Sequence, residues 1–510
     1  MRFVADARTP SWILPPHAIR KGRTVTLFVF PCGIRGDVCI LMAMDMTRRE
    51  FLAGTAAFAF GAFESFAVPP KPHLEPRQGQ IGIWEHPDGS ATDSVMVRRM
   101  YLDLAGHLPT RSEAQAYVFA ADSAKRERLV DELLDSRSVA DYWTMRFCDI
   151  LRVKSEFPIN LWPNAVYVYH ARIHSFVERN EPWDAFGRAL LTAQGSNFRD
   201  AEVNFFRATD QRTPEGWAAS VAQTFLALPL TQLSDERRAR FRAAFANLKI
   251  KCTREWKEEI VYVDGPDRRG ELCDSLFGEN RAETAAAFRQ LVGSWVLGPD
   301  YVFDSPTTEF RLKEVLKSIL LSPAYARGSV TGGFPARRLD AEVLDDAICT
   351  LSGSTRDLQS PAPEPFTYLP PDRPTICVED GSISNGFLTL FGRPARDTGL
   401  LDERGQDVTA KQRLYLFNSG KLHQQLGGIV GFGKKNAGKK NPLAQMPFPK
   451  RVDDLYWRLL ARAPSPRERQ LLVGMLQRQR LQNPSAARPF ELLRDVAWCL
   501  VNSKEFLFRI

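Results

Sequence analysis

The same order of helix end, proline and new helix start occurs near both ends of the chain. The first copy runs from Tyr101 to Glu113 and the second from Tyr456 to Glu468. In each copy, an apolar stretch led by Tyr reaches a Pro, and a Thr or Ser follows with Glu three residues later. The hydroxyl can accept a hydrogen bond from the amide of the Glu, whose carboxylate reaches back to the first residue. The pattern therefore predicts a helix start, followed by an amphipathic helix, at both ends of the chain.

Helical patterns also dominate the region between the two copies. The chain has 510 residues, of which 44% are hydrophobic and 25% charged, and this is the composition of a globular protein with a core. Strand-like runs such as Ile260 to Val263 are few, and they do not alternate with helices as a parallel sheet requires. We therefore expect a mainly α, multi-helix protein with helical repeat modules at both ends and small β inserts. We place its domains at residues 95–265 and 280–510.

The first residues carry the pattern of an export signal. Arg48 and Arg49 precede a short Ala- and Gly-rich apolar stretch, and small residues around Ala67 suit a signal peptidase. We expect a Tat signal peptide at 46–67, with Met46 or Met44 as the true start and the residues before it as a mis-called extension. Residues 68–94 are expected to be a linker. The predicted product is exported, periplasmic or associated with the cell envelope, and has no stable membrane span after cleavage.

Charge, cysteines and histidines exclude several classes of function. The net charge of +8 is spread along the chain without a dense basic stripe, so nucleic acid is not an expected partner. The cluster at residues 434–440 is either a solvated loop or a loop for an anionic ligand.

None of the eight cysteines forms a Cys-x-x-Cys-His motif, so no haem or other cofactor is expected. Cys252 and Cys273 either pair or remain thiols. His170 and His174 share one helix face, for which a structural role is favoured over a metal site.

Three loops rich in Arg, Asn and Trp are the expected places for a ligand. They lie at 152–165, 195–207 and 391–399, where side chains at helix ends and turns often hold ligands. The ligand-binding candidates in these loops are Lys154, Asn160, Trp162, Asn164, Ser196, Asn197, Arg199, Asn204, Arg207, Arg393 and Arg396. The carboxylates considered for acid–base catalysis are Glu156, Glu255, Glu258 and Asp397. No nucleotide-binding loop or hydrolase motif accompanies them, so the sequence does not name a reaction.

Several of these motifs also resemble two known families. Residues 99–110, 154–164 and 195–199 resemble domain of unknown function 1549, the planctomycete cytochrome-type domain (PSCyt-two). Residues 337–342, 391–399 and 502–507 resemble its usual companion, domain of unknown function 1553, the planctomycete-specific domain (PSD-one). Many relatives carry a haem-binding Cys-x-x-Cys-His segment where residues 228–233 of this chain have none. The segment at 293–305 is also shorter than is usual in the family.

The resemblance implies a role in the breakdown of complex polysaccharides. Family members are exported bacterial proteins, often encoded beside exported proteins of the sulfatase or alkaline-phosphatase type. We expect an exported, haem-free accessory or binding protein that has an anionic glycan, such as a sulfated one, and a sulfatase-like protein as partners. The alternative is a glycan-acting hydrolase or lyase that uses Glu, Asp and Arg side chains in a cleft between the two domains. Convergence of the three loops on one place would turn separate motifs into a site.

Overall fold

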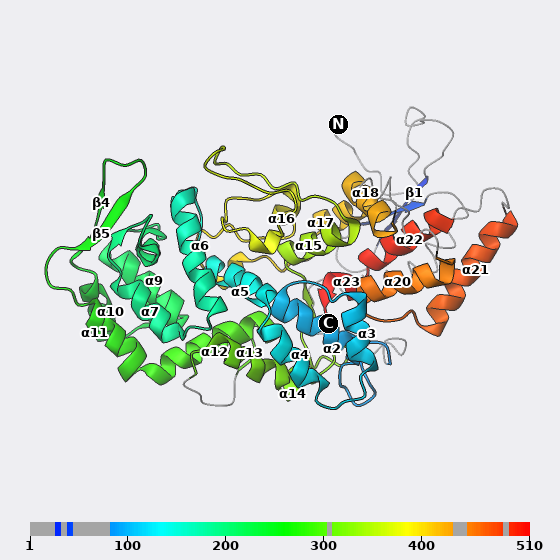
Figure 1. Cartoon of the computed structure of the whole chain (residues 1–510), viewed down its shortest axis with the longest axis horizontal. Helices are drawn as coiled ribbons and strands as arrows, with labels where there is room; N and C mark the ends of the chain where they lie inside the picture. The colour runs from blue at the N-terminus through cyan, green and yellow to red at the C-terminus, as the bar shows by residue number, and fades with distance from the viewer. Residues whose placement is uncertain (1–25, 32–37, 44–81, 303–308, 432–445, 483–488) are drawn as a thin grey trace.

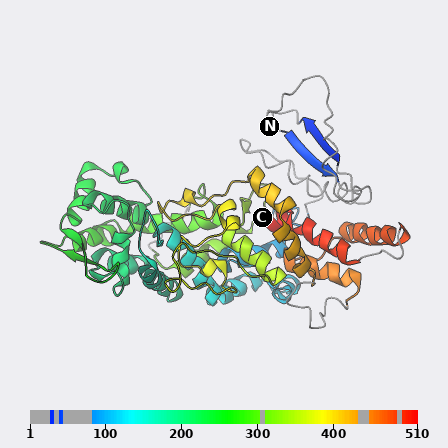
Figure 2. The ribbon, with the colours of Figure 1, turned by 90° about the horizontal axis from the view of Figure 1, so that it is seen from above.

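The computed structural model describes residues 26–31, 38–43, 82–302, 309–431, 446–482 and 489–510. The predicted signal peptide at 46–67, most of the linker and the Lys-rich cluster at 434–440 lie outside these residues. The described part is elongated, with α7 and α9–α11 at one end and α20–α22 at the other (Figures 1 and 2). Helices form most of it, and the prediction of a mainly α fold with small β inserts is confirmed.

The helices fall into two groups that follow each other along the chain. Those of the first group are α2 (Asp93–Met100), α3 (Arg111–Phe119), α4 (Lys125–Leu134), α5 (Arg137–Ile150), α6 (Pro163–Glu178), α7 (Trp183–Thr192), α8 (Asn204–Arg207), α9 (Pro214–Leu226), α10 (Asp235–Ala244), α11 (Arg269–Asp274) and α12 (Arg281–Leu297). Those of the second group are α13 (Leu312–Leu321), α14 (Pro323–Ala326), α15 (Ala341–Ser352), α16 (Gly386–Leu390), α17 (Ala410–Asn418), α18 (Gly420–Ile429), α20 (Phe448–Leu460), α21 (Pro466–Gln482), α22 (Pro489–Val501) and α23 (Lys504–Leu507). Short turns of other helix types are η2 (Tyr101–Ala105), η3 (Ala201–Val203), η4 (Leu230–Gln232), η5 (Ser275–Glu279), η6 (Thr375–Cys377) and η7 (Leu401–Glu403).

The strands are short and form three small antiparallel sheets in the described residues. They are β1 (Thr26–Pro31), β2 (Val38–Ala43), β3 (Gly195–Ser196), β4 (Leu248–Cys252), β5 (Glu259–Val263), β6 (Arg337–Arg338) and β7 (Phe508–Arg509). β1 pairs with β2, β5 lies between β3 and β4, and β6 pairs with β7. The expected β-type run near residue 260 is therefore the central strand of an insert. β6 and β7 join parts of the chain that are far apart in sequence. Arg338 of β6 lies opposite Phe508 of β7, which follows 170 positions later.

The two predicted helix starts are both present. Thr110 accepts from the amide of Glu113 at 3.3 Å and donates its own amide to that carboxylate at 2.6 Å. Ser465 and Glu468 repeat both bonds, at 3.3 and 2.6 Å. The helix before each start also ends in the same way, since Gly106 and Ala461 take the left-handed conformation with φ of 66° and 56°.

The repeated modules contact each other and bring distant parts of the chain together. Arg111, in the first turn of α3, donates to Asp454 of α20 at 3.1 Å. Phe119 lies 5.7 Å from Trp457 between ring centroids. Further along, Arg98 donates to the carbonyl of Phe508 at 2.9 Å. The modules therefore work as a packing frame, in which the first helices of the described body hold the last strand.

Aromatic side chains fill the centre of the first helix group. Trp183 lies in contact with Phe147, Phe176, Phe225 and Phe288, at centroid distances from 5.1 to 5.6 Å. All five side chains are at most 1% exposed. Such pairs add to the free energy gained by burying apolar area. This rigid core supports α6 and the loop that precedes it.

Candidate functional site

The loop before α6 folds back on itself and presents a tryptophan. The amide of Leu161 donates to the carbonyl of Lys154 at 3.2 Å, and the amide of Trp162 donates to that of Ser155 at 3.3 Å. Pro163 occupies the first turn of α6, where a missing N–H is tolerated. The backbone therefore holds Trp162 firmly on both sides, at the start of a helix.

The second helix group anchors the same loop. The amide of Ser155 donates to Asp380 at 2.9 Å, and the amide of Glu156 donates to the hydroxyl of Ser382 at 3.1 Å. Lys154 also forms an ion pair with Asp397. The loop at 152–162 and the turn at 391–399 thus meet through this ion pair, across the boundary between the two groups.

The hairpin of β4 and β5 brings a second tryptophan to this place. Ser196, at the end of β3, donates its hydroxyl to Glu258 at 2.6 Å. Asn197 donates its side-chain amide to the carbonyl of Lys257 at 3.1 Å. These two bonds hold the hairpin tip, from which Trp256 projects with 70% of its side chain exposed. The Gly-Ser-Asn motif at 195–197 therefore positions the tip through side chains that are themselves buried.

Three aromatic rings and one cation form a surface cluster that we name the aromatic platform. It consists of Trp162, Trp256, Phe366 and Lys257. The ring of Trp162 lies 6.4 Å from that of Trp256 and 5.2 Å from that of Phe366, measured between centroids. The ammonium of Lys257 lies 5.5 Å from the centroids of both tryptophans. Phe366 comes from the Pro-rich loop between α15 and α16, so both helix groups contribute to the platform.

Two more exposed aromatic side chains lie in the loops that supply Trp162 and Phe366. Phe157 is 76% exposed and Tyr368 is 69% exposed. Isolated apolar residues on a surface are ordinary, whereas a group of them marks a binding surface. Aromatic rings also lose little conformational entropy on binding, since they have only two side-chain torsions. The clustering of these rings is therefore the feature of the described surface that most favours ligand binding.

The backbone at the platform is held in an uncommon conformation. Trp162 has φ of 68°, Lys257 has 62° and Asn160 has 57°. Such values cost free energy for residues other than Gly, and they occur most often at functional sites. For Trp162 and Lys257 the conformation is maintained by the hydrogen bonds of the loop and of the hairpin tip. The strain is thus placed on two of the residues that form the platform.

The predicted catalytic carboxylates lie at different places around this site. Glu255 is exposed in the hairpin turn and Glu156 is half-buried in the loop before α6. Hydrogen bonds from the hydroxyls of Ser196 and Thr253 lower the pKa of Glu258, which favours its carboxylate form. Asp397 accepts from Lys154 as described. A general acid needs a raised pKa, so Glu258 has the environment of a structural carboxylate.

Other predicted ligand-binding residues have internal partners or lie near the platform. Arg207 donates to Glu259 at 2.6 Å, and Asn204 donates to the carbonyl of Asn197 at 3.0 Å. Both side chains are buried and support β5 and the 195–200 turn. Asn160, Asn164 and Arg199 are exposed. Asn160 and Asn164 flank Trp162 in sequence, and the positive charge of Arg199 helps to lower the pKa of Glu258.

The two arginines of the 391–399 turn belong to a buried network rather than to the surface. Arg396 donates to Asp149 at 2.9 Å, and Arg404 donates to Asp149 at 2.6 Å and to Glu342 at 2.7 Å. Arg393 lies 3.3 Å from Glu342, and burial lowers its pKa to about 10. We name these five residues the arginine network. It joins α5 to α15, and its guanidinium groups are turned toward the protein interior.

His170 and His174 lie on one face of α6, as their spacing predicts. Their ring centroids are 6.4 Å apart, and His174 is 3.0 Å from Asp141. Among the residues that the structure describes, no group of three or more His, Cys, Asp or Glu side chains is placed to hold a metal ion.

Cys252 and Cys273 are both free thiols. In the described ranges no helix has the length and apolar character needed to cross a membrane.

His170 is expected to make stability depend on pH. Burial, together with the charge of Arg396, lowers its pKa to about 3, whereas an unfolded His titrates near 6.5. The stabilisation is therefore complete above pH 6.5 and is lost as the pH falls. Lowering the pH from 7 to 5 should therefore reduce the free energy of unfolding by about 2 kcal/mol through this group. Urea unfolding of His170→Gln should show a pH dependence that is weaker by this amount.

His174 provides the matched control for this measurement. A hydrogen bond with Asp141 raises the pKa of His174, so its contribution is present below pH 6.5 and is lost as the pH rises. His174→Gln should therefore change the pH dependence in the opposite direction. An unaltered pH dependence in His170→Gln would contradict the assignment of a half-buried, neutral imidazole.

Sequence reasoning did not select Trp256, Lys257, Phe366 or Tyr368. A signal for the first two was present, because Trp256 is an apolar residue within the highly charged run from Arg254 to Glu259. Because its neighbours are charged, this segment is expected to stay at the surface, and the aromatic ring with it. For Phe366 and Tyr368 no comparable signal exists, since they lie in a Pro-rich loop whose course depends on tertiary contacts.

Two family comparisons match most of the described body. Residues 84–255 match PSCyt2, a protein family of unknown function (DUF1549), and residues 306–476 match PSD1, a second family of unknown function (DUF1553). No curated protein and no solved structure matches the chain. The first matched region contains Trp162 and ends at the hairpin tip, and the second contains Phe366. The aromatic platform thus lies where the two matched regions meet.

Proposed function

From the premise that this chain belongs to the proteins in which a DUF1549 (PSCyt2) domain precedes a DUF1553 (PSD1) domain, we propose that it is an exported accessory protein that binds a glycan on its aromatic platform. The observation that carries the proposal is the exposed ring of Trp256 beside Trp162, which also contacts Phe366. Trp162 lies in a loop and Trp256 lies at a hairpin tip. Hydrogen bonds within the protein hold both segments in the positions that bring these rings together.

A pyranose ring is the chemical partner that such a surface fits. One face of many sugars consists of C–H groups, which carry a small positive charge and shed little bound water. The face of an aromatic ring is negative and apolar, so the two surfaces attract and exclude water together. The rings of the platform are tilted relative to each other, with interplanar angles of 82° and 60°. This arrangement suits a bent chain of several sugars better than a flat aromatic ligand.

Lys257 favours an anionic glycan over a neutral one. Its ammonium lies near both tryptophan rings, where it would reach a sulfate or carboxylate group of a sugar stacked on either ring. The exposed side chain of Arg199 adds a second cation in the 195–200 turn. After removal of residues 1–67, which carry a net charge of +3, the exported chain keeps a net charge of +5, and this attracts an anionic polymer over longer distances.

The cellular setting of this proposal comes from the sequence. The twin-arginine pattern at 46–67 supports export, and the family resemblance supports a sulfatase-like protein as partner in polysaccharide breakdown. Protein isolated from the cell envelope should begin near residue 68 on N-terminal sequencing, and it should co-purify with that partner. A mature protein that begins upstream of Met44 would remove the export signal from the proposal.

Calorimetric titration with defined oligosaccharides tests the binding function. The full chain is titrated with a sulfated hexasaccharide and with its desulfated counterpart, and the mixture is then assayed for new reducing ends. We expect saturable binding that is tighter for the sulfated form, with no new reducing ends. Cleavage of the oligosaccharide would favour the hydrolase or lyase alternative, and absence of binding to either form would remove the proposal.

Lys257→Gln should lower the affinity for the sulfated oligosaccharide by about 3- to 10-fold and leave the affinity for the desulfated form unchanged. An ion pair at an exposed site contributes on the order of 1 kcal/mol, which corresponds to this range. Calorimetry of the variant with both oligosaccharides provides the measurement. Lys251→Gln, which removes a lysine from the same hairpin away from the tip, is the control. Equal losses for both oligosaccharides would show that Lys257 acts on the shape of the tip instead.

A further inference from the structure

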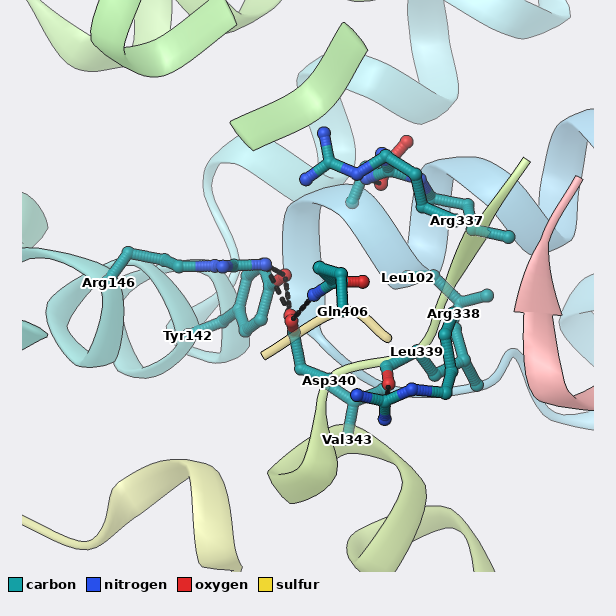
Figure 3. A pocket seen from close by; sticks show the side chains of 11 residues that line it. Leu102, Tyr142, Arg146, Arg337, Arg338, Leu339, Asp340, Val343 and Gln406 are labelled. Carbon is teal, nitrogen blue, oxygen red and sulfur yellow. Dashed lines mark hydrogen bonds and ion pairs between the residues drawn. The ribbon is translucent and has the colours of Figure 1, made fainter. Parts of the chain in front are cut away.

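A small cavity lies where the first helices, the start of α15 and the last strand meet (Figure 3). It is partly open and has a volume of about 20 Å³, which is room for one or two water-sized groups. The lining includes four arginines, two aspartates and a glutamine, which are Arg146, Arg337, Arg338, Arg509, Asp103, Asp340 and Gln406. The formal charge of these walls is therefore positive by two.

Two of the four arginines are neutralised within the protein. Arg146 forms an ion pair with Asp340, and Arg509 forms one with Asp103. The hydroxyl of Tyr142 also donates to Asp340, at 3.2 Å. Both aspartates are thus engaged, and Asp340 also lies 3.7 Å from the guanidinium of Arg404.

The other two arginines have only carbonyl partners. Arg337 donates to the carbonyls of Ser294 at 2.7 Å and Trp295 at 3.3 Å, and Arg338 donates to that of Phe391 at 2.8 Å. Among the described residues, no carboxylate forms an ion pair with either guanidinium. Burial and the charges of Arg509 and Arg146 lower the pKa of Arg337 to about 10. Arg337 is half-buried and Arg338 is buried, and the charge of Asp340 acts on both without a direct ion pair. Two cations of the lining therefore have no carboxylate of the described residues in direct contact.

Several hydrogen-bond donors of the lining also lack a partner. The Nε atoms of Arg146, Arg338 and Arg509 are buried and donate to no group in the described part of the chain. Oε1 of Gln406, which is a hydrogen-bond acceptor, is also buried and has no partner among these residues. A buried charge without a partner costs several kcal/mol, so such groups are normally paired. Unpartnered donors thus outnumber acceptors in the cavity lining.

We propose that this cavity binds a monovalent anion of about the size of chloride. The positive walls supply the electrostatic attraction, and the guanidinium groups of Arg337 and Arg338, which have no ion pair within the described ranges, would supply hydrogen bonds. The small volume excludes a polyatomic ligand with organic substituents. This proposal is independent of the platform, since none of the platform residues lines the cavity.

The anion would connect parts of the chain that are far apart in sequence. Arg146 belongs to α5, Arg337 and Arg338 form β6, and Arg509 lies in β7. A ligand that contacts all of them stabilises the pairing of β6 with β7 and its docking on α5. Binding to the folded state alone raises the temperature of unfolding, and the rise follows the logarithm of the anion concentration once this exceeds the dissociation constant. The cavity is thus expected to make the stability of the whole body depend on small anions.

Thermal unfolding in two sodium salts tests the proposal. The full chain is heated in sodium gluconate, whose anion is too large for the cavity, and bromide replaces gluconate at constant ionic strength. We expect the unfolding temperature to rise by about 2–4 °C, with a logarithmic dependence on bromide concentration above the dissociation constant. In Arg337→Gln the same rise should require at least tenfold higher bromide. Arg137→Gln, a change at an exposed position of α5, should behave as the wild type does.

A crystal soaked in bromide gives a second, independent readout. The expected result is an anomalous scattering peak within the cavity, close to Arg337 and Arg338. No bromide-specific rise in the wild type, or an equal rise in Arg337→Gln, would overturn the proposal. If the variant fails to fold, the crystal decides, and absence of the peak overturns the proposal by itself.

Discussion

Replacing Arg404 with Met is expected to lower the free energy of unfolding by about 3–5 kcal/mol. The guanidinium of Arg404 donates to both Asp149 and Glu342, and the latter side chain is completely buried. Loss of the guanidinium leaves two carboxylates in a low-dielectric interior with only Arg396 and Arg393 nearby. Such a loss costs more than the pair itself contributes, since the remaining charges stay desolvated.

Urea unfolding of Arg404→Met against Arg188→Met measures this effect. Arg188 forms an exposed ion pair with Asp274, so its replacement should cost less than about 1 kcal/mol. The cost of Arg404→Met should also shrink as the pH is lowered, because the orphaned carboxylates gain protons there. A loss as small as that of Arg188→Met would contradict the importance of the arginine network for the stability of the protein.

Replacing Trp256 with Ala is expected to weaken glycan binding by about 10- to 100-fold, with little effect on stability. Stacking on an aromatic side chain contributes on the order of 1–3 kcal/mol per ring, which corresponds to this range. The ring is largely exposed, so its removal takes little area from the core. Calorimetric titration with the sulfated hexasaccharide, together with thermal unfolding, measures both quantities.

Phe119→Ala is the matched control for this prediction. Phe119 is an exposed aromatic residue of α3, 71% accessible, and it lies outside the platform. Its replacement should leave the affinity unchanged. If Phe119→Ala weakens binding as much as Trp256→Ala does, the glycan is held by unspecific apolar contact and the platform has no special role.

The helical frame could be predicted from sequence because its signals are local. The bond between Thr110 and Glu113, and that between Ser465 and Glu468, join residues three positions apart and are encoded in a short pattern. The family resemblance depends on longer motifs of the same kind, and the comparisons confirm it. The mainly α class follows from periodicity, which also needs no knowledge of distant contacts.

The candidate site could be predicted only in part, since it depends on distant contacts. Trp162 was selected from its loop, but its neighbour Phe366 follows about two hundred residues later in the chain. Conversely, the sequence around Arg393 and Arg396 is typical of a ligand-binding turn. In the structure both side chains are buried, where they form ion pairs with Glu342 and Asp149. A single sequence does not show which arginine will meet a carboxylate from another element.

A crystal structure of the full chain with the sulfated hexasaccharide tests the central proposal most directly. The account predicts a pyranose ring stacked on Trp162 or Trp256, with a sulfate group beside the ammonium of Lys257. Density for the oligosaccharide at another surface, or none on the platform at a concentration that saturates binding in solution, would contradict it.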